Sequence, residues 1–174
     1  MIKFVEGNLP DHKYAGTSST IQNVGNRLQA TIIFDTEYLN SATDLSLART
    51  IIHESIHAMF YLGVDGGMGS AFTEANKLLY DGNGSYQLQP VQHQQMALNY
   101  VDEIATLLKS FANDRGITPP VPESERDEYY ELLAYGGLHD SDAWEELGLD
   151  ETDAGYIIAN ERQGNLASSR TSSC

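Results

Sequence analysis

Two histidines and a glutamate stand in a spacing that suits metal-assisted hydrolysis. The run His53–His57, of sequence His-Glu-Ser-Ile-His, places its histidines one helical turn apart, on the same face if the segment is helical. Two imidazoles so placed can bind one zinc ion, Zn²⁺. Glu54 lies beside them, where its carboxylate can polarise a water molecule activated by the metal rather than bind the metal itself. We therefore expect His53 and His57 to be metal ligands and Glu54 to be the catalytic base.

The residues around this motif predict the helix that it needs. Ser41 and Asp44 form a helix start signal, and Gly63 with the Asp65-Gly66-Gly67 cluster ends the helix. The motif therefore falls in the middle of a helix, although a surface helix with incidental histidines is the alternative interpretation. The apolar side chains recur at three- and four-residue steps, as in an amphipathic helix: Leu45, Ala48, Ile52, Ile56 and Met59.

A third ligand is needed, because a catalytic zinc ion usually has three protein ligands and one open position. His93 is the predicted third ligand. It lies in line with one face of a second predicted helix, residues 91–113, and burying an imidazole there without a partner would be costly. The other members of that face are apolar or aromatic: Met96, Ala97, Tyr100, Ile104, Leu107 and Phe111.

Other side chains stay open as candidates for the third position. Glu103 lies at the edge of the same helix face and is the second choice, and Glu74 is possible for a glutamate-type site. Asp65 and His139 are weaker candidates, because each lies in a predicted turn. Asp102 points away from the face and could only support a ligand if the helix were rotated, and His12 is expected to be exposed in a polar loop.

Composition limits the classes of protein that this chain fits. Its 174 residues suit one soluble domain with a sizeable core. The formal net charge of −15 disfavours nucleic acid and anionic membrane surfaces as partners, and no apolar run reaches transmembrane length. Cys174 is the only cysteine, so one chain has no disulfide framework, and no signal-peptide pattern stands at the N-terminus. We expect a cytoplasmic protein.

The order of predicted elements favours an α+β fold. Strands are expected at residues 2–5 and 28–39, with a further strand near 19–24, before the motif helix. A short helix is expected at residues 73–79. Three short helices, at 123–135, 141–147 and 151–162, follow the second long helix, with a core of Tyr129, Leu132, Leu133, Trp144, Leu147, Ile157 and Ile158. We predict a single domain over residues 1–164 and a disordered tail over 165–174.

Together, the strand at residues 31–34, the His-Glu-x-x-His helix and the downstream helix with His93 resemble the zincin metallopeptidases. The resemblance implies a small, mostly antiparallel sheet whose edge strand packs on the motif helix. It also implies that substrate peptides pair with residues 30–36 of that edge by strand addition. The metzincin subgroup does not fit, because Gly63 stands where its third histidine would be.

Residues 93–104 and 133–144 resemble small, mostly uncharacterised zincin-like proteins of Bacteroidetes and their phages, including SprT-like forms. No basic region or zinc ribbon accompanies them, so a DNA-repair role is not expected.

These features predict a zinc-dependent peptidase that acts on peptides or proteins, with Glu54 as general base. The alternatives are a catalytically silent zincin-fold protein that binds a metal or a partner, and a metal-assisted hydrolase of another amide. A tyrosine that assists in the transition state is possible, with Tyr61, Tyr100 and Tyr135 as candidates. No pattern in the sequence indicates cleavage specificity or oligomeric state.

Overall fold

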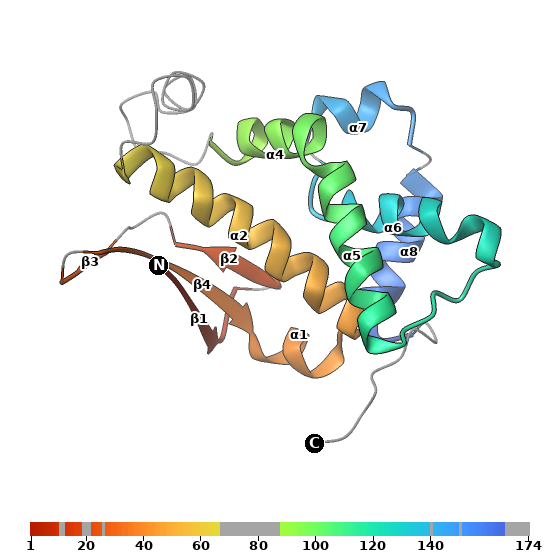
Figure 1. Cartoon of the computed structure of the whole chain (residues 1–174), viewed down its shortest axis with the longest axis horizontal. Coiled ribbons are helices and arrows are strands. Elements are labelled where there is room, and N and C mark those ends of the chain that lie inside the picture. The colour runs from red at the N-terminus through yellow and green to blue at the C-terminus, as the bar shows by residue number, and fades with distance from the viewer. Residues whose placement is uncertain are drawn as a thin grey trace. The chain divides into compact units, whose positions relative to one another are not determined.

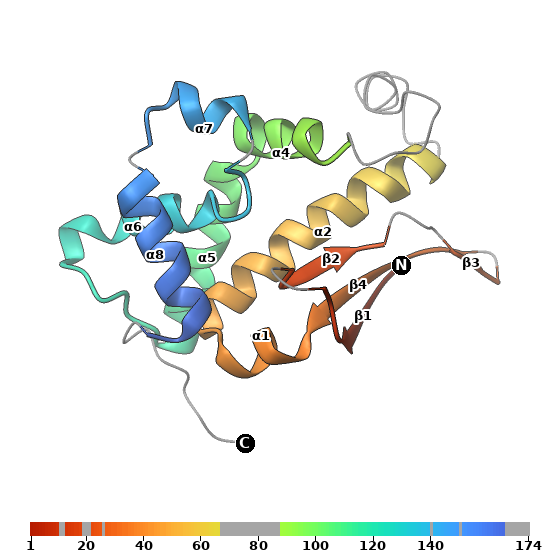
Figure 2. The ribbon, with the colours of Figure 1, turned by 180° about the vertical axis from the view of Figure 1, so that it is seen from behind.

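The described part of the chain is an α+β structure with a four-stranded mixed sheet and seven α-helices (Figures 1 and 2). The computed structural model describes residues 1–10, 13–18, 22–25, 27–66, 88–139, 141–149 and 151–165. Chain contacts divide it into a first unit, residues 1–36 with 53–92, and a second unit, residues 37–52 with 93–174. The expectation of one domain over residues 1–164 stays a prediction. No helix in the described ranges has the length and hydropathy needed to cross a bilayer.

The sheet of the first unit is built around one long strand. Ala30, Ile32 and Phe34 alternate along this strand and are at most 5% exposed, as the two-residue period of a half-buried strand requires. The strand pairs in parallel with the first strand and antiparallel with the two short ones. The strands are β1 (Ile2–Gly7), β2 (Ala15–Thr17), β3 (Gln22–Val24) and β4 (Arg27–Asp35).

The prediction that β4 is an edge strand is wrong. Its register with β1 runs from Ile2 opposite Ala30 to Gly7 opposite Asp35. On its other side β4 pairs with β2 and β3, and the backbone N–H of Ser18 donates to the carbonyl of Thr31 between them. Both hydrogen-bonding edges of β4 are therefore occupied, and a peptide cannot add along residues 30–36 without displacing a strand. The sheet is mixed, and its longest pairing is parallel.

The helix that carries the motif was correctly predicted. Helix α2 extends over Asp44–Gly66. It therefore continues through Gly63 and ends at Gly66, within the predicted Asp65-Gly66-Gly67 end signal. Its N-terminus is capped by Thr43, whose Oγ1 accepts a hydrogen bond of 3.1 Å from the N–H of Ser46. The part of α2 in the first unit runs alongside β2 and β4 in both views (Figures 1 and 2).

The predicted strand over 28–39 ends early, because helix α1 (Thr36–Ser41) begins directly after β4. Burial of Tyr38 in the second unit accounts for this helix. Tyr38 is 2% exposed, and its hydroxyl lies 2.6 Å from Oγ1 of Thr50 and donates to the carbonyl of Ser46 at 2.9 Å. A tertiary contact thus overrides the strand propensity of the local sequence.

The second long helix is interrupted. Instead of one helix over 91–113, the chain forms α4 (Leu88–Asn99) and α5 (Val101–Arg115), with a break at Tyr100, where φ is −130°. The predicted continuous face is therefore wrong beyond the break, since Leu107 is 52% exposed and Leu108 is buried. The second half ends at Arg115, two residues beyond the predicted end at 113, where Gly116 has a φ of 66° and its N–H donates to the carbonyl groups of α5.

The three predicted C-terminal helices are present in the second unit. A 3₁₀ turn (Glu123–Glu125) leads into α6 (Arg126–Ala134), which α7 (Asp142–Glu146) and α8 (Glu151–Gln163) follow. Of the expected core residues, Leu147 is 57% exposed and is a wrong prediction. Tyr129, Leu133 and Trp144 are buried, whereas Leu132, Ile157 and Ile158 are half-buried.

A buried carboxylate joins three segments of this unit. Glu161 of α8 is fully buried, and it accepts hydrogen bonds from the hydroxyl groups of Thr43 and Tyr129. The N–H of Thr43 also donates to the backbone carbonyl of Glu161 at 2.9 Å. These bonds satisfy polar groups that would be costly to bury alone.

Candidate metal centre

His53 and His57 lie on one face of α2, as their spacing predicts. Their Nε2 atoms are 3.1 Å apart, and their ring planes are inclined at 70°. Both side chains are buried, at 5% and 3% exposure. Two imidazole nitrogens that point at the same small volume in a low-dielectric setting form an apt pair of metal ligands.

His93 completes a cluster of three imidazoles. It lies in α4, is 8% exposed, and offers a nitrogen that lies within 4.8 Å of the ligand nitrogens of His53 and His57. Within the described ranges, these three histidines are the group that could hold a metal ion. Glu103, the second choice for the third ligand, is exposed on α5 and does not belong to this group.

The remaining candidates do not join the cluster or lie outside the described residues. His139 is exposed after α6, and Asp102 is exposed on α5. His12, Glu74 and the predicted helix over 73–79 lie outside the described residues, as do residues 166–174 of the predicted tail and the side chains of Asp65 and Tyr61.

The other two tyrosine candidates lie in the second unit. Tyr100 is half-buried at the break between α4 and α5. The ring of Tyr135 packs edge-on against Trp144 with centroids 6.1 Å apart, which is a packing role. Burial raises the pKa of Tyr135, and the charges of Asp102 and Glu131 act in the same direction.

Gln92 makes a contact that sequence reasoning missed. Its Oε1 lies 2.6 Å from Nδ1 of His57, and the side chain is 3% exposed. An amide oxygen can only accept a hydrogen bond, so Nδ1 carries the proton and the lone pair of the neutral ring resides on Nε2. That nitrogen is the one that faces His53, so Gln92 selects the tautomer of His57 that can bind a metal. The only sign of this contact in the sequence is that Gln92 directly precedes the predicted ligand His93.

Glu54 is held by a residue from the sheet. Its side chain is 8% exposed, and Oγ1 of Thr17 in β2 donates to Oε2 of Glu54 at 2.7 Å. The same hydroxyl lies 2.9 Å from the backbone carbonyl oxygen of Glu54. Because one hydroxyl hydrogen serves both acceptors, Thr17 fixes the carboxylate relative to the backbone of α2. Thr17 was also missed, since it lies in a segment rich in Gly, Ser and Thr that reads as a loop.

The residues present fit zinc. Imidazole donors suit Zn²⁺ and similar transition metals, whereas Mg²⁺ and Ca²⁺ prefer oxygen. Zinc–nitrogen bonds of about 2.0–2.1 Å in a tetrahedral site place ligand nitrogens about 3.3 Å apart. The separation of 3.1 Å between His53 and His57 is close to that value, whereas the limit of 4.8 Å for the three nitrogens shows only that His93 lies near the pair.

Comparisons of the chain with protein-family models, with curated proteins and with solved structures find no match. The assignment of a function to this centre therefore depends on its geometry and chemistry.

Proposed function

We propose that the protein is a zinc-dependent peptidase with a zincin-like fold, in which His53, His57 and His93 hold the metal. The observation that carries the proposal is the three-histidine cluster with the carboxylate of Glu54 on the same helix as two of its members. Bound Zn²⁺ would supply a Lewis acid that activates water and polarises a carbonyl group. The cytoplasm is the proposed location, since a single cysteine fits a reducing compartment.

Glu54 is the proposed general base. Its carboxylate takes a proton from the attacking water and delivers it to the amine that leaves when the peptide bond breaks. Thr17 keeps that carboxylate in one position, so little reorganisation is needed during the reaction. Peptides or proteins are the proposed substrates. Nucleic acid is not, because a net charge of −15 repels a polyanion.

A catalytically silent zincin-fold protein that binds a metal or a partner is the second candidate. It needs the histidines but not the carboxylate. The hydrogen bond from Thr17 to the buried Glu54 favours the peptidase, because a metal site that only stabilises the fold has no use for a base held in this way.

Metal content and peptide cleavage test the proposal together. The purified parent is expected to contain one zinc ion per chain and to cleave a mixed peptide library, and a chelator should abolish cleavage until zinc is restored. His93→Ala should lose most of the metal, whereas His139→Ala, which replaces an exposed histidine, should retain it. Zinc binding without chelator-sensitive cleavage would support the silent protein, and equal zinc content in the two variants would refute the ligand set.

A further inference from the structure

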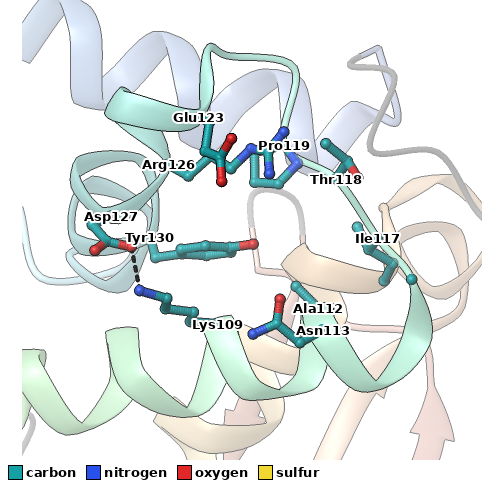
Figure 3. A pocket seen from close by; sticks show the side chains of 11 residues that line it. Lys109, Ala112, Asn113, Ile117, Thr118, Pro119, Glu123, Arg126, Asp127 and Tyr130 are labelled. Atoms are coloured by element: carbon teal, nitrogen blue, oxygen red, sulfur yellow. Dashed lines mark hydrogen bonds and ion pairs between the residues drawn. The ribbon is translucent and has the colours of Figure 1, made fainter.

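A pocket lies in the helical unit and is lined by no residue of the metal centre. It has a volume of about 410 Å³ and lies between α5, the 3₁₀ turn and α6. That volume falls in the range of about 300–1,000 Å³ that is usual for small-molecule sites. Figure 3 shows Tyr130 lying across the pocket, between Lys109 from α5 and Arg126 from α6.

The pocket is lined by the half-buried Arg126, one of whose guanidinium N–H groups is buried and lacks an acceptor. Among the described residues, none accepts a hydrogen bond from Nε of Arg126, although that atom is buried. A guanidinium N–H without an acceptor is costly to bury, and native structures rarely contain a buried donor that has no hydrogen-bond partner. Lys109, the other cation of the pocket, is already paired, because its Nζ lies 2.6 Å from Oδ1 of Asp127. The charge that a ligand can neutralise is therefore that of Arg126.

Tyr130 places a second donor beside Arg126. Its side chain is 4% exposed and lines the pocket. Burial raises the pKa of Tyr130, and Arg126 exerts the largest opposing influence among the neighbouring charges. The phenol therefore stays protonated at neutral pH and can donate a hydrogen bond to a ligand in the pocket.

We propose that this pocket binds a small molecule through a single carboxylate, which the guanidinium of Arg126 and the hydroxyl of Tyr130 receive. A guanidinium fork matches the two oxygens of a carboxylate, and charge-assisted bonds of this kind are the strong ones. Glu123 and Asp127 also line the pocket and repel any anion, and the repulsion on a dianion such as phosphate is about twice that on a singly charged carboxylate.

The other walls indicate what the rest of the ligand carries. Ala112, Ile117 and Pro119 are buried apolar side chains in the lining, which suit an aliphatic group. The carboxylate of Glu123 is an acceptor for an ammonium group on the same ligand. An apolar α-amino acid and an apolar carboxylic acid both carry the required carboxylate, and the ammonium group distinguishes them.

Titration with a matched set of probes tests this site. Leucine, N-acetylleucine, leucinamide and inorganic phosphate are added to the full-length protein, while binding is followed by calorimetry and by the ¹H–¹⁵N signal of Arg126 Nε. Leucine and N-acetylleucine should bind and shift that signal, whereas leucinamide and phosphate should not. Tighter binding of leucine identifies an amino acid as the ligand class, and tighter binding of N-acetylleucine identifies a plain carboxylic acid.

Variants show whether the contact is specific. Arg126→Gln should weaken leucine or N-acetylleucine binding by at least about tenfold, and Tyr130→Phe by about two- to tenfold. Arg115→Gln removes the same charge outside the pocket lining and should leave affinity unchanged. Circular dichroism checks that each variant is folded.

Binding of leucinamide as tight as that of leucine, no binding of either carboxylate, or equal weakening by Arg115→Gln would overturn the proposal. None of these readouts depends on zinc or on peptide cleavage. The carboxylate pocket and the peptidase function are therefore tested independently of each other.

Discussion

The amide oxygen of Gln92 lies 2.6 Å from Nδ1 of His57 and so leaves Nε2 of that ring as the nitrogen with a lone pair. The contact is buried, because both side chains are 3% exposed. A residue that does not touch the metal would thus decide whether one of its ligands is ready to bind. Partners of this kind commonly account for a factor of about 10–100 in metal affinity.

Gln92→Met should weaken zinc binding by about 10–100-fold, because it retains the bulk of the side chain but removes the acceptor for Nδ1–H. A competition titration of the metal-free protein with a chromogenic chelator measures the change. Gln92→Glu keeps an acceptor and should retain most of the affinity. Gln95→Met is the matched control, since Gln95 lies on the same helix and bonds to Asn99 instead. An unchanged affinity in Gln92→Met would mean that the contact only packs the helix.

Glu54→Gln should lower kcat/KM for peptide cleavage by at least about 100-fold, because an amide cannot accept the proton from water. The zinc content should be unchanged, since Glu54 is not a proposed ligand. Elemental analysis and a fluorogenic peptide assay on the same preparation give both values. Cleavage at the parent rate would exclude Glu54 as the base, and loss of zinc would assign it to the metal instead.

Thr17→Val should lower kcat by about tenfold and leave KM nearly unchanged, because the hydrogen bond to Oε2 positions the base rather than the substrate. Valine has nearly the same shape, so the packing of β2 is retained. Thr17→Ser restores the hydroxyl and should recover most of the rate. If both variants lose activity equally, the methyl group of Thr17 matters and the hydrogen bond does not.

Tyr129→Phe should destabilise the fold by about 1–3 kcal/mol, because it removes a hydrogen bond to the buried carboxylate of Glu161. For a chain of this length, that change corresponds to a decrease in Tm of about 2–4 °C per kcal/mol, measurable by calorimetry. Tyr156→Phe removes a hydroxyl from a side chain that is 63% exposed on α8 and should have almost no effect. Equal values of Tm for the two variants would show that Glu161 does not need the phenol.

The elements that the sequence predicts well are those whose signals are local. Helix α2 shows an apolar stripe, although Thr43 and not the predicted Ser41 caps its N-terminus, and Gly116 ends α5 where a left-handed residue is required. The failures come from contacts between distant residues. The burial of Tyr38 makes Thr36–Ser41 helical, and nothing local distinguishes a central β4 from an edge strand, because pairing with β1 and β2 depends on chain topology.

The residues of the candidate site also divide into those that local sequence predicts and those that depend on distant contacts. His53, Glu54 and His57 are recognisable because their spacing is a property of one helix. His93 was predicted from one face of a continuous helix, and the break at Tyr100 shortens that face. His93 lies in α4, before the break, and it joins the histidine cluster as expected. Gln92 and Thr17 each act through a side chain that bonds to one residue at least 35 positions away, and such isolated contacts leave no pattern in a sequence.

The buried bond between Thr43 and Glu161 has a consequence for biosynthesis. The two residues are 118 positions apart in the chain. At a synthesis rate of about 5–20 residues per second, the ribosome adds Glu161 roughly 6–24 s after Thr43. During that interval the hydroxyl of Thr43 lacks the carboxylate that it bonds to in the folded protein. The bonds that join Thr43 to α8 therefore form only after translation has passed α8.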